Sequence, residues 1–423
     1  MKENLLHFIW NMKLFNTSKM TSNCGKTIKI FKSGEPNINT GPDFLNAKIE
    51  IENQLWAGNV EIHVNSSDWY AHKHETDANY DAVILHVVWN DDVSVFRKNN
   101  EEIPTLELKK YISVDVLNNF NNLFEKNKNW INCEKDIAKI DSFTLLHWKE
   151  RLYFERLEQK SELIKAILIK TTNNWEETLF LLLAKNFGLK VNGEAFYSLV
   201  TSFNFAVFQK SLGSITLLEA LLFGQAGMLE VENESEYFKN LKKEYEFLKT
   251  KFKLTPISPN QIQYFRLRPN NFPTIRLSQL AGLYVLHHNL FSNIIEAKCI
   301  EDFYKIFSVS TSNFWETHYT FSKESKKSTK KLTKSFVNLL IINTIIPVLF
   351  MYYKSLGKTN NSLILSFLEE IQPEKNSIIS KFSDLKINSK NAFDSQALIQ
   401  LKNEYCAKQR CLNCAIGKEL LKN

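Results

Sequence analysis

The chain has 423 residues, enough for two or three domains with sizeable cores. Its 44% hydrophobic and 23% charged residues describe an ordinary soluble globular protein, and a net charge of +7 permits a polyanionic partner without requiring one. No uninterrupted apolar stretch reaches the roughly 18 residues of a membrane span. The nearest, 336–353, is broken by Asn338, Asn343 and Pro347. We therefore expect a cytoplasmic protein with no membrane partner, whose six cysteines form no structural disulfides.

The N-terminal segment intersperses Lys2, Glu3, His7 and Asn11 with apolar residues. This pattern predicts an amphipathic helix over 3–15 rather than the unbroken apolar core of a signal peptide. A strand is expected at 27–31.

The segment 37–88 holds most of the residues that carry chemistry. Alternation of Ala47, Ile49 and Ile51 with polar residues predicts one half-buried strand, 60–64 predicts a second, and Glu52-Asn53 joins them. Because side chains alternate along a strand, Glu61 and His63 should share one face. Four of the nine histidines lie in this segment, and four of its acids are candidate site residues beside them: His63, His72, His74, His86, Asp43, Glu61, Asp68 and Asp77.

Gly41-Pro42 is a turn signal that places Asp43 where a loop enters the first strand. If the strands pair, Asp43 lies across from Glu61, within about 3–6 Å of its carboxylate. Two carboxylates with His63 would suit Mg²⁺ or Mn²⁺, the histidine positioning or deprotonating an attacking water. Alternating acids are, however, also typical of a solvated strand face.

The downstream histidines allow more than one interpretation. His72 and His74 in an extended segment would share a face and could ligate Zn²⁺, Mn²⁺ or Fe²⁺. They could equally line the mouth of the site and contact phosphate, or be structural. His86 falls inside the apolar run 82–88, which predicts a fully buried strand and favours a neutral core histidine.

Pro42-Asp43 followed by Glu61-Ile62-His63 resembles the PD-(D/E)XK signature of restriction-endonuclease-like nucleases, with His63 in the usual lysine position. The resemblance implies Asp43 and Glu61 as metal ligands, His63 as the group that orients water, and Glu3 on the N-terminal helix as an additional ligand. A neutral imidazole can act as a base near pH 7 but lacks the permanent charge of lysine.

A longer pattern runs through the chain: GPDF, VEIH, SDWxxHxHxxDxxY, LHVV, then RLRPxNFPTxR and a cysteine-bearing C-terminus. It is similar to an uncharacterised bacterial family, domain of unknown function 2851. That family implies no activity.

After Tyr111 helical periodicity replaces alternation. The fold class is therefore predicted as α+β, with a small restriction-endonuclease-like α/β sheet core over 1–112 and a large all-α region over 113–423. A strand at 104–108 closes the sheet. Helices are expected over 143–170, 174–187, 194–204, 215–223, 234–252, 274–291, 332–353, 363–370 and 393–405.

Loops in the helical region offer one candidate binding site. Arg266, Arg268 and Arg276 flank two prolines, which fix the backbone and would present the guanidinium groups to phosphate. A structural arginine network between loop and helix is an equal alternative. The glycines of 223–228 predict a helix end and turn, and the lysine-rich run 323–334 predicts a solvated loop.

The C-terminus concentrates three thiols, Cys406, Cys411 and Cys414. With a fourth thiolate they would bind Zn²⁺ or a [4Fe-4S] cluster, and a zinc site would bring the sulfurs within about 4 Å. Cys133 is the expected fourth ligand because it lies in a polar linking segment, unlike Cys24 or Cys299. The layout resembles iron-sulfur nucleases in which one distant cysteine joins three near the C-terminus, although there the lone cysteine precedes the nuclease motifs.

The sequence thus predicts a metal-dependent nuclease-like phosphodiesterase acting on nucleic acid. Two alternatives stay open. One is a non-catalytic interaction module for nucleic acid or protein on the same fold. The other is a hydrolase of a different substrate, with a transition metal on the histidine cluster.

Overall fold

The computed structural model describes residues 2–124, 129–231 and 233–422. By its internal contacts the chain divides into two compact units, and each is described by itself. The first comprises Met1–Trp148, Asp384–Ile387 and Leu401–Asn423, and the second comprises Lys149–Ser383 and Asn388–Gln400. A sheet region followed by a large helical region confirms the mixed α+β class.

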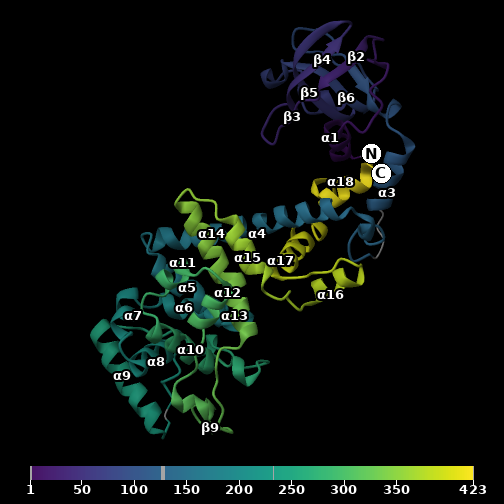
Figure 1. The fold of residues 1–423 in the computed structure, drawn as a ribbon. Coiled ribbons are helices and arrows are strands. Elements are labelled where there is room, and N and C mark those ends of the chain that lie inside the picture. The colour runs from purple at the N-terminus through teal and green to yellow at the C-terminus, as the bar shows by residue number, and fades with distance from the viewer. Residues whose placement is uncertain (1, 125–128, 232, 423) are drawn as a thin grey trace. The chain divides into compact units, whose positions relative to one another are not determined.

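The first unit is built on a mixed sheet in the order β1-β2-β4-β5-β6-β7, with β3 beside β4 (Figure 1). Strands β1 to β5 pair antiparallel, whereas β5, β6 and β7 run parallel. The strands are β1 Met20–Thr21, β2 Thr27–Lys32, β3 Glu35–Pro36, β4 Phe44–Ile51, β5 Gln54–Asn65, β6 Val83–Asn90 and β7 Thr105–Glu107.

The expected hairpin between β4 and β5 is confirmed. Ile51 pairs with Gln54, and both turn residues, Glu52 and Asn53, have positive φ, as a two-residue turn of type I′ requires. Ala47, Ile49 and Ile51 are buried, so the alternation identified the core face correctly.

Helix α1 (Glu3–Met12) covers that core face. Its residues Leu5, Leu6 and Ile9 pack in one hydrophobic cluster with Val60 and Ile62 of β5. Leu421 belongs to the same cluster, and its helix α18 (Ala415–Lys422) lies against α3 (Val114–Phe124), which periodicity did not predict. The first unit therefore extends beyond the expected boundary near residue 112 and includes the C-terminal segment, because apolar residues at both places share one core.

The opposite face of β5 and β6 carries a smaller apolar cluster of Trp69, Val83, Val95 and Ile103. The short helix α2 (Asp68–Ala71) and the 3-10 turn η1 (Ala78–Tyr80) lie in the crossover from β5 to β6. Glu61, His63 and His86 are buried on these strands, so polar side chains lie enclosed beside this cluster.

Helix α4 (Ser142–Lys170) leads into the second unit. In the described residues of this unit the strands are those of one small hairpin, β8 (His318–Thr320) and β9 (Lys323–Glu324). The expected helix over 274–291 is two helices, since α10 ends at Leu286. The stretches expected over 332–353 and 393–405 each contain a π-helical segment, Ile341–Ile345 and Leu401–Cys406, respectively.

The remaining α-helices are α5 Trp175–Phe187, α6 Leu189–Thr201, α7 Phe205–Ser211, α8 Ile215–Gln225, α9 Glu236–Phe252, α10 Pro273–Leu286, α11 Leu290–Glu296, α12 Ile300–Ile306, α13 Lys334–Leu340, α14 Ile346–Ser355, α15 Asn361–Glu369, α16 Ser377–Asp384 and α17 Ala392–Gln400.

One helical stretch, Lys334–Ser355, is long and apolar enough by length and composition to cross a membrane, with a mean hydropathy of 1.9. Two thirds of this window (67%) is buried inside the protein, as in a core helix.

Candidate metal centre

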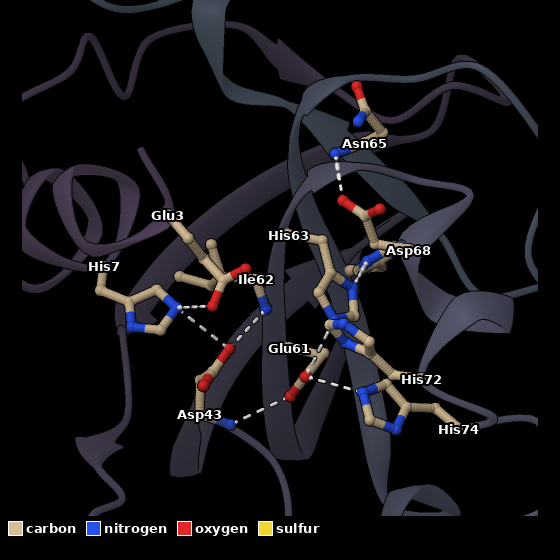
Figure 2. Close-up of polar contacts among 11 residues, drawn as sticks. Glu3, His7, Asp43, Glu61, Ile62, His63, Asn65, Asp68, His72 and His74 are labelled. Atoms are coloured by element: carbon tan, nitrogen blue, oxygen red, sulfur yellow. Dashed lines mark hydrogen bonds and ion pairs between the residues drawn. The ribbon is translucent and has the colours of Figure 1, made fainter. Parts of the chain in front are cut away.

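Glu61 and His63 leave the same face of β5 and point into the protein. Their exposed fractions are 4% and 1%, which excludes the solvated strand face considered as an alternative. His63 Nε2 lies 3.4 Å from Glu61 Oε1 (Figure 2). The two side chains therefore form one buried polar group, as their period-two spacing predicts.

Asp43 reaches the same place from the start of β4, where the pairing with β5 shifts and Asn46 has positive φ. Its backbone N–H donates to Glu61 Oε2 (3.1 Å), and Asp43 Oδ2 accepts from the backbone N–H of Ile62 (3.0 Å). His7 Nε2 of α1 lies 3.2 Å from Asp43 Oδ2 (Figure 2). Asp43 and Glu61 are adjacent, as the sequence predicts.

Glu3 lies one helical turn before His7. Its Oε1 is 3.9 Å from His7 Nε2, and Glu3 is exposed. The structure thus brings Glu3 to the edge of the group, in contact with Asp43 only through His7.

The crossover after β5 supplies the other histidines. Asp68 Oδ2 accepts from the backbone N–H of Asn65 (2.9 Å) and fixes the turn into α2. Lys73, with φ of +60°, then reverses the chain so that His72 and His74 both face β5. His72 Nδ1 lies 3.1 Å from His63 Nε2, and His74 Nε2 lies 3.3 Å from Glu61 Oε1 (Figure 2).

These distances match those of a metal coordination shell. Within the described residues, His63, His72 and His74 form the one group whose three ligand atoms lie mutually within 4.8 Å. Glu61 Oε1 lies 3.3–3.4 Å from two of these rings. A tetrahedral ion about 2.0–2.1 Å from nitrogen and oxygen ligands separates neighbouring ligand atoms by about 3.3 Å. The side chains are therefore spaced to hold one transition-metal ion.

The rings of the histidine group are also held by side chains that pack against them, namely His86, Trp69 and Tyr80. His86 Nε2 lies 2.9 Å from His63 Nδ1, so the second ring nitrogen of His63 has a fixed partner, as is usual for metal-binding histidines. The Tyr80 ring stacks on His74 with centroids 3.7 Å apart, and Trp69 packs edge-on against it. His86 is buried, as predicted, and its partner is the site itself.

Burial and neighbouring charges set the protonation of the group. Burial is the largest cause that raises the pKa of Glu61, and the charge of Asp43 raises it further. Burial, followed by the charges of His74 and His72, lowers the pKa of His63 to about 4. Burial lowers the pKa of His7, but the hydrogen bond and charge of Asp43 and the charges of Glu3 and Glu61 outweigh it, so the net shift is upward. His63 is neutral near pH 7, with a lone pair available to a cation.

Asp43 and His7 also line a cleft of about 500 Å³ in the first unit. Its other wall comes from the C-terminal segment, which contributes Lys408, Arg410 and Lys418. Lys408 is paired with Glu404 at 2.6 Å. Among the described residues, three cations thus line a cleft to which Asp43 contributes the one carboxylate.

The chain matches a family model, Protein of unknown function (DUF2851), over residues 3–377. It belongs to the DUF2851 family. No significant match is found among curated proteins or among solved structures.

A second cluster in this DUF2851 protein involves the thiols. Cys133, Cys406, Cys411 and Cys414 line one small cavity of the first unit, as the sequence predicts. Cys24 is exposed, and Cys299 precedes α12 in the second unit. No three of the thiols lie mutually within 4.8 Å in the described part of the chain, so the spacing of about 4 Å expected for zinc is not observed.

The three arginines considered for phosphate binding lie in the second unit. Arg276 is buried. Its Nη1 and Nη2 groups donate to Gln279 Oε1 (2.8 Å) and Asn271 Oδ1 (2.6 Å), and its guanidinium lies over the Phe336 ring. This geometry matches the structural network considered as an alternative. Arg266 is exposed and lies over Phe265, and Arg268 precedes a 3-10 turn. Phosphate binding by Arg266 and Arg268 stays a prediction.

Sequence reasoning missed His7 and the basic residues of the C-terminal segment. The signal for His7 was its position four residues after Glu3, which places both on one helix face. No comparable signal existed for Lys408, Arg410 or Lys418, because their proximity to Asp43 comes from the packing of α18 with the sheet core.

Proposed function

We propose that this protein is a transition-metal-dependent phosphodiesterase that hydrolyses the backbone of nucleic acid. The observation that carries the proposal is the convergence of Glu61, His63, His72 and His74 at distances of 3.1–3.4 Å, beside a basic cleft that ends at Asp43. The resemblance of Pro42-Asp43 and Glu61-Ile62-His63 to the PD-(D/E)XK signature supports the same reaction class.

The side chains favour Zn²⁺, Mn²⁺ or Fe²⁺ over Mg²⁺. Imidazole nitrogens suit transition metals, whereas Mg²⁺ prefers an octahedron of oxygens and keeps several waters. When bound, the ion polarises a phosphoryl oxygen and makes water more acidic. His63 is thus proposed as a ligand, with its Nδ1–H held by His86. A Mg²⁺ or Mn²⁺ ion between Asp43 and Glu61 is the rival arrangement.

Asp43 and His7 supply the proton chemistry in this proposal. The Asp43 carboxylate is held by the backbone N–H of Ile62 and by His7, and it opens to the cleft. It would orient the attacking water and take up its proton, while His7 keeps the carboxylate in place. A phosphodiester lying in the cleft would meet Arg410 and Lys418 on the facing wall.

A cleavage assay on single-stranded and double-stranded DNA and RNA tests the proposal. With Mn²⁺ or Zn²⁺ the wild-type protein should cleave at least one of these substrates, and Asp43→Ala should lower the rate by roughly 10²–10⁴, the usual scale for a general base. Cleavage lost in Asp43→Ala without lost metal binding supports the assigned role. Binding of nucleic acid without cleavage under any metal would instead support the non-catalytic module.

The cleft makes a separate prediction about affinity. Arg410→Glu combined with Lys418→Glu should weaken binding of a nucleic acid oligomer by at least about tenfold and flatten the dependence of affinity on salt, because fewer phosphate counterions are released. Lys422→Glu, an exposed lysine on the same helix outside the cleft lining, is the matched control. Fluorescence anisotropy over a range of salt concentrations measures both effects. Equal weakening in the control would indicate a general charge effect.

A further inference from the structure

The four thiols of the first unit come from segments far apart in the chain that are tied together around one cavity. Lys402 Nζ donates to the Trp130 carbonyl (2.7 Å) and lies over the Trp130 ring, joining the segment before Cys133 to the C-terminal segment. Asn132 Nδ2 donates to Cys411 Sγ at 3.5 Å. These contacts therefore hold Cys133 close to the C-terminal cysteines.

The C-terminal segment folds tightly so that its three cysteines face the cavity. The π-helical turn ends at Cys406, Gln409 adopts a positive φ, and a 3-10 turn begins at Cys411. Gly417 allows the next helix to approach, because a Cβ there would lie 2.2 Å from the Cys411 carbonyl oxygen. The backbone of a short loop is thus shaped to present Cys406, Cys411 and Cys414 to one point.

The surroundings of the sulfurs suit a thiolate-bound iron-sulfur group. The side-chain amide of Asn132 donates to the Cys411 sulfur. Apolar Leu123, Leu401 and Ile416 close the rest of the cavity. Hydrogen bonds to the sulfurs and an apolar shell are the features by which proteins stabilise iron-sulfur clusters and set their potential.

The spacing of the thiols decides between the two kinds of group. Four thiolates on one Zn²⁺ lie about 3.8 Å apart and leave no space between them. Here no three sulfurs of the described chain lie mutually within 4.8 Å. In a cubane cluster each cysteine binds a different iron, so the sulfurs lie farther apart than sulfurs that share one ion.

We propose that Cys133, Cys406, Cys411 and Cys414 bind a [4Fe-4S] cluster. Lys408 and Arg410 lie between Cys406 and Cys411 in the sequence, and both line the cleft beside Asp43. A cluster bound by these cysteines would therefore hold the basic wall of the cleft in place. It has no part in the hydrolysis proposed above, and its test is independent of activity.

The full-length protein, purified without oxygen and reconstituted with ferrous iron and sulfide, should contain about four iron and four sulfide per chain. It should show a broad visible absorption that bleaches on reduction. Cys133→Ser and Cys411→Ser should lose most of the iron and of the absorption, whereas Cys24→Ser and Cys299→Ser should keep both. Stoichiometric zinc in place of iron, no iron after reconstitution, or equal iron in Cys411→Ser would overturn the proposal.

If a cysteine variant does not fold, its loss of iron is uninformative, and a measurement on the wild-type protein replaces it. Alkylation followed by mass spectrometry should leave the four proposed ligands unmodified while Cys24, which is exposed, reacts. Removal of iron with a chelator should then make the four thiols reactive together. Four thiols whose reactivity does not depend on iron would contradict the cluster.

Discussion

Glu61→Gln should abolish both metal binding at the histidine group and phosphodiester hydrolysis, with a rate loss of at least about 10³-fold. Glu61 Oε1 lies between two imidazole nitrogens, and Glu61 Oε2 accepts from Asp43. An amide keeps the size of the side chain but removes its charge. The expected loss corresponds to several kcal/mol of charge stabilisation that a bound metal supplies in the transition state.

Glu50→Gln is the matched control for this substitution. Glu50 lies on the neighbouring strand β4 and pairs with Lys29 at 2.6 Å, away from the histidines. The rate and metal content of the Glu50→Gln protein should stay within about twofold of wild type, since surface ion pairs contribute little to stability. Metal content is measured by elemental analysis after dialysis. A Glu61→Gln protein that retains metal and activity would remove the site from consideration.

His63 substitutions should separate a metal ligand from a water-activating base. As a ligand, His63→Lys should lose metal and activity together, because an ammonium group cannot coordinate a cation. As a base, His63→Ala should lower the rate by roughly 10²–10⁴ with metal affinity little changed, and His63→Lys should keep some activity. The 3.1–3.4 Å distances around His63 Nε2 lead us to expect the first result.

His147→Ala is the control, since His147 is an exposed histidine of the same unit outside the group. Metal titration followed by calorimetry measures the affinities of all three variants. Full activity in His63→Ala would exclude both roles.

The pH dependence of activity and metal binding in the wild-type protein should reflect the lowered pKa of His63. Burial and the neighbouring histidines lower its pKa to about 4, so the ring stays neutral as pH falls through 6.5. Protonation of His63 below about pH 5 would then prevent its ring nitrogen from coordinating the metal. We therefore expect His63 to cause loss of activity only in that lower range. Metal affinity and rate of the wild-type protein, measured as a function of pH, check this assignment, and a loss of metal binding already near pH 6.5 would contradict it.

Local patterns predicted the strands and the orientation of the site residues on them. Alternation placed Glu61 and His63 on one face, and Glu52-Asn53 identified the turn, because period and turn chemistry depend on neighbouring residues. Cys133 could be chosen as the fourth thiol from its polar linking segment. These predictions needed no knowledge of the tertiary fold.

Other features depend on contacts between distant segments. His86 was predicted as buried, yet its partner His63 follows from the parallel register of β5 with β6. The inclusion of the C-terminal cysteines in the first unit follows from the packing of Leu421 into the sheet core. The burial of Arg276 against Phe336 likewise joins residues sixty positions apart. A single sequence carries no local signal for such pairings.

An anomalous-scattering map of crystals grown with Zn²⁺ or Mn²⁺ tests the central claim most directly. We predict one strong peak about 2.0–2.2 Å from Glu61 Oε1, His63 Nε2 and His74 Nε2, with His72 as a further ligand. The peak should be absent in crystals of Glu61→Gln. A peak bound by Asp43 and Glu61 without the histidines, or no peak in this group at saturating metal, would contradict the account.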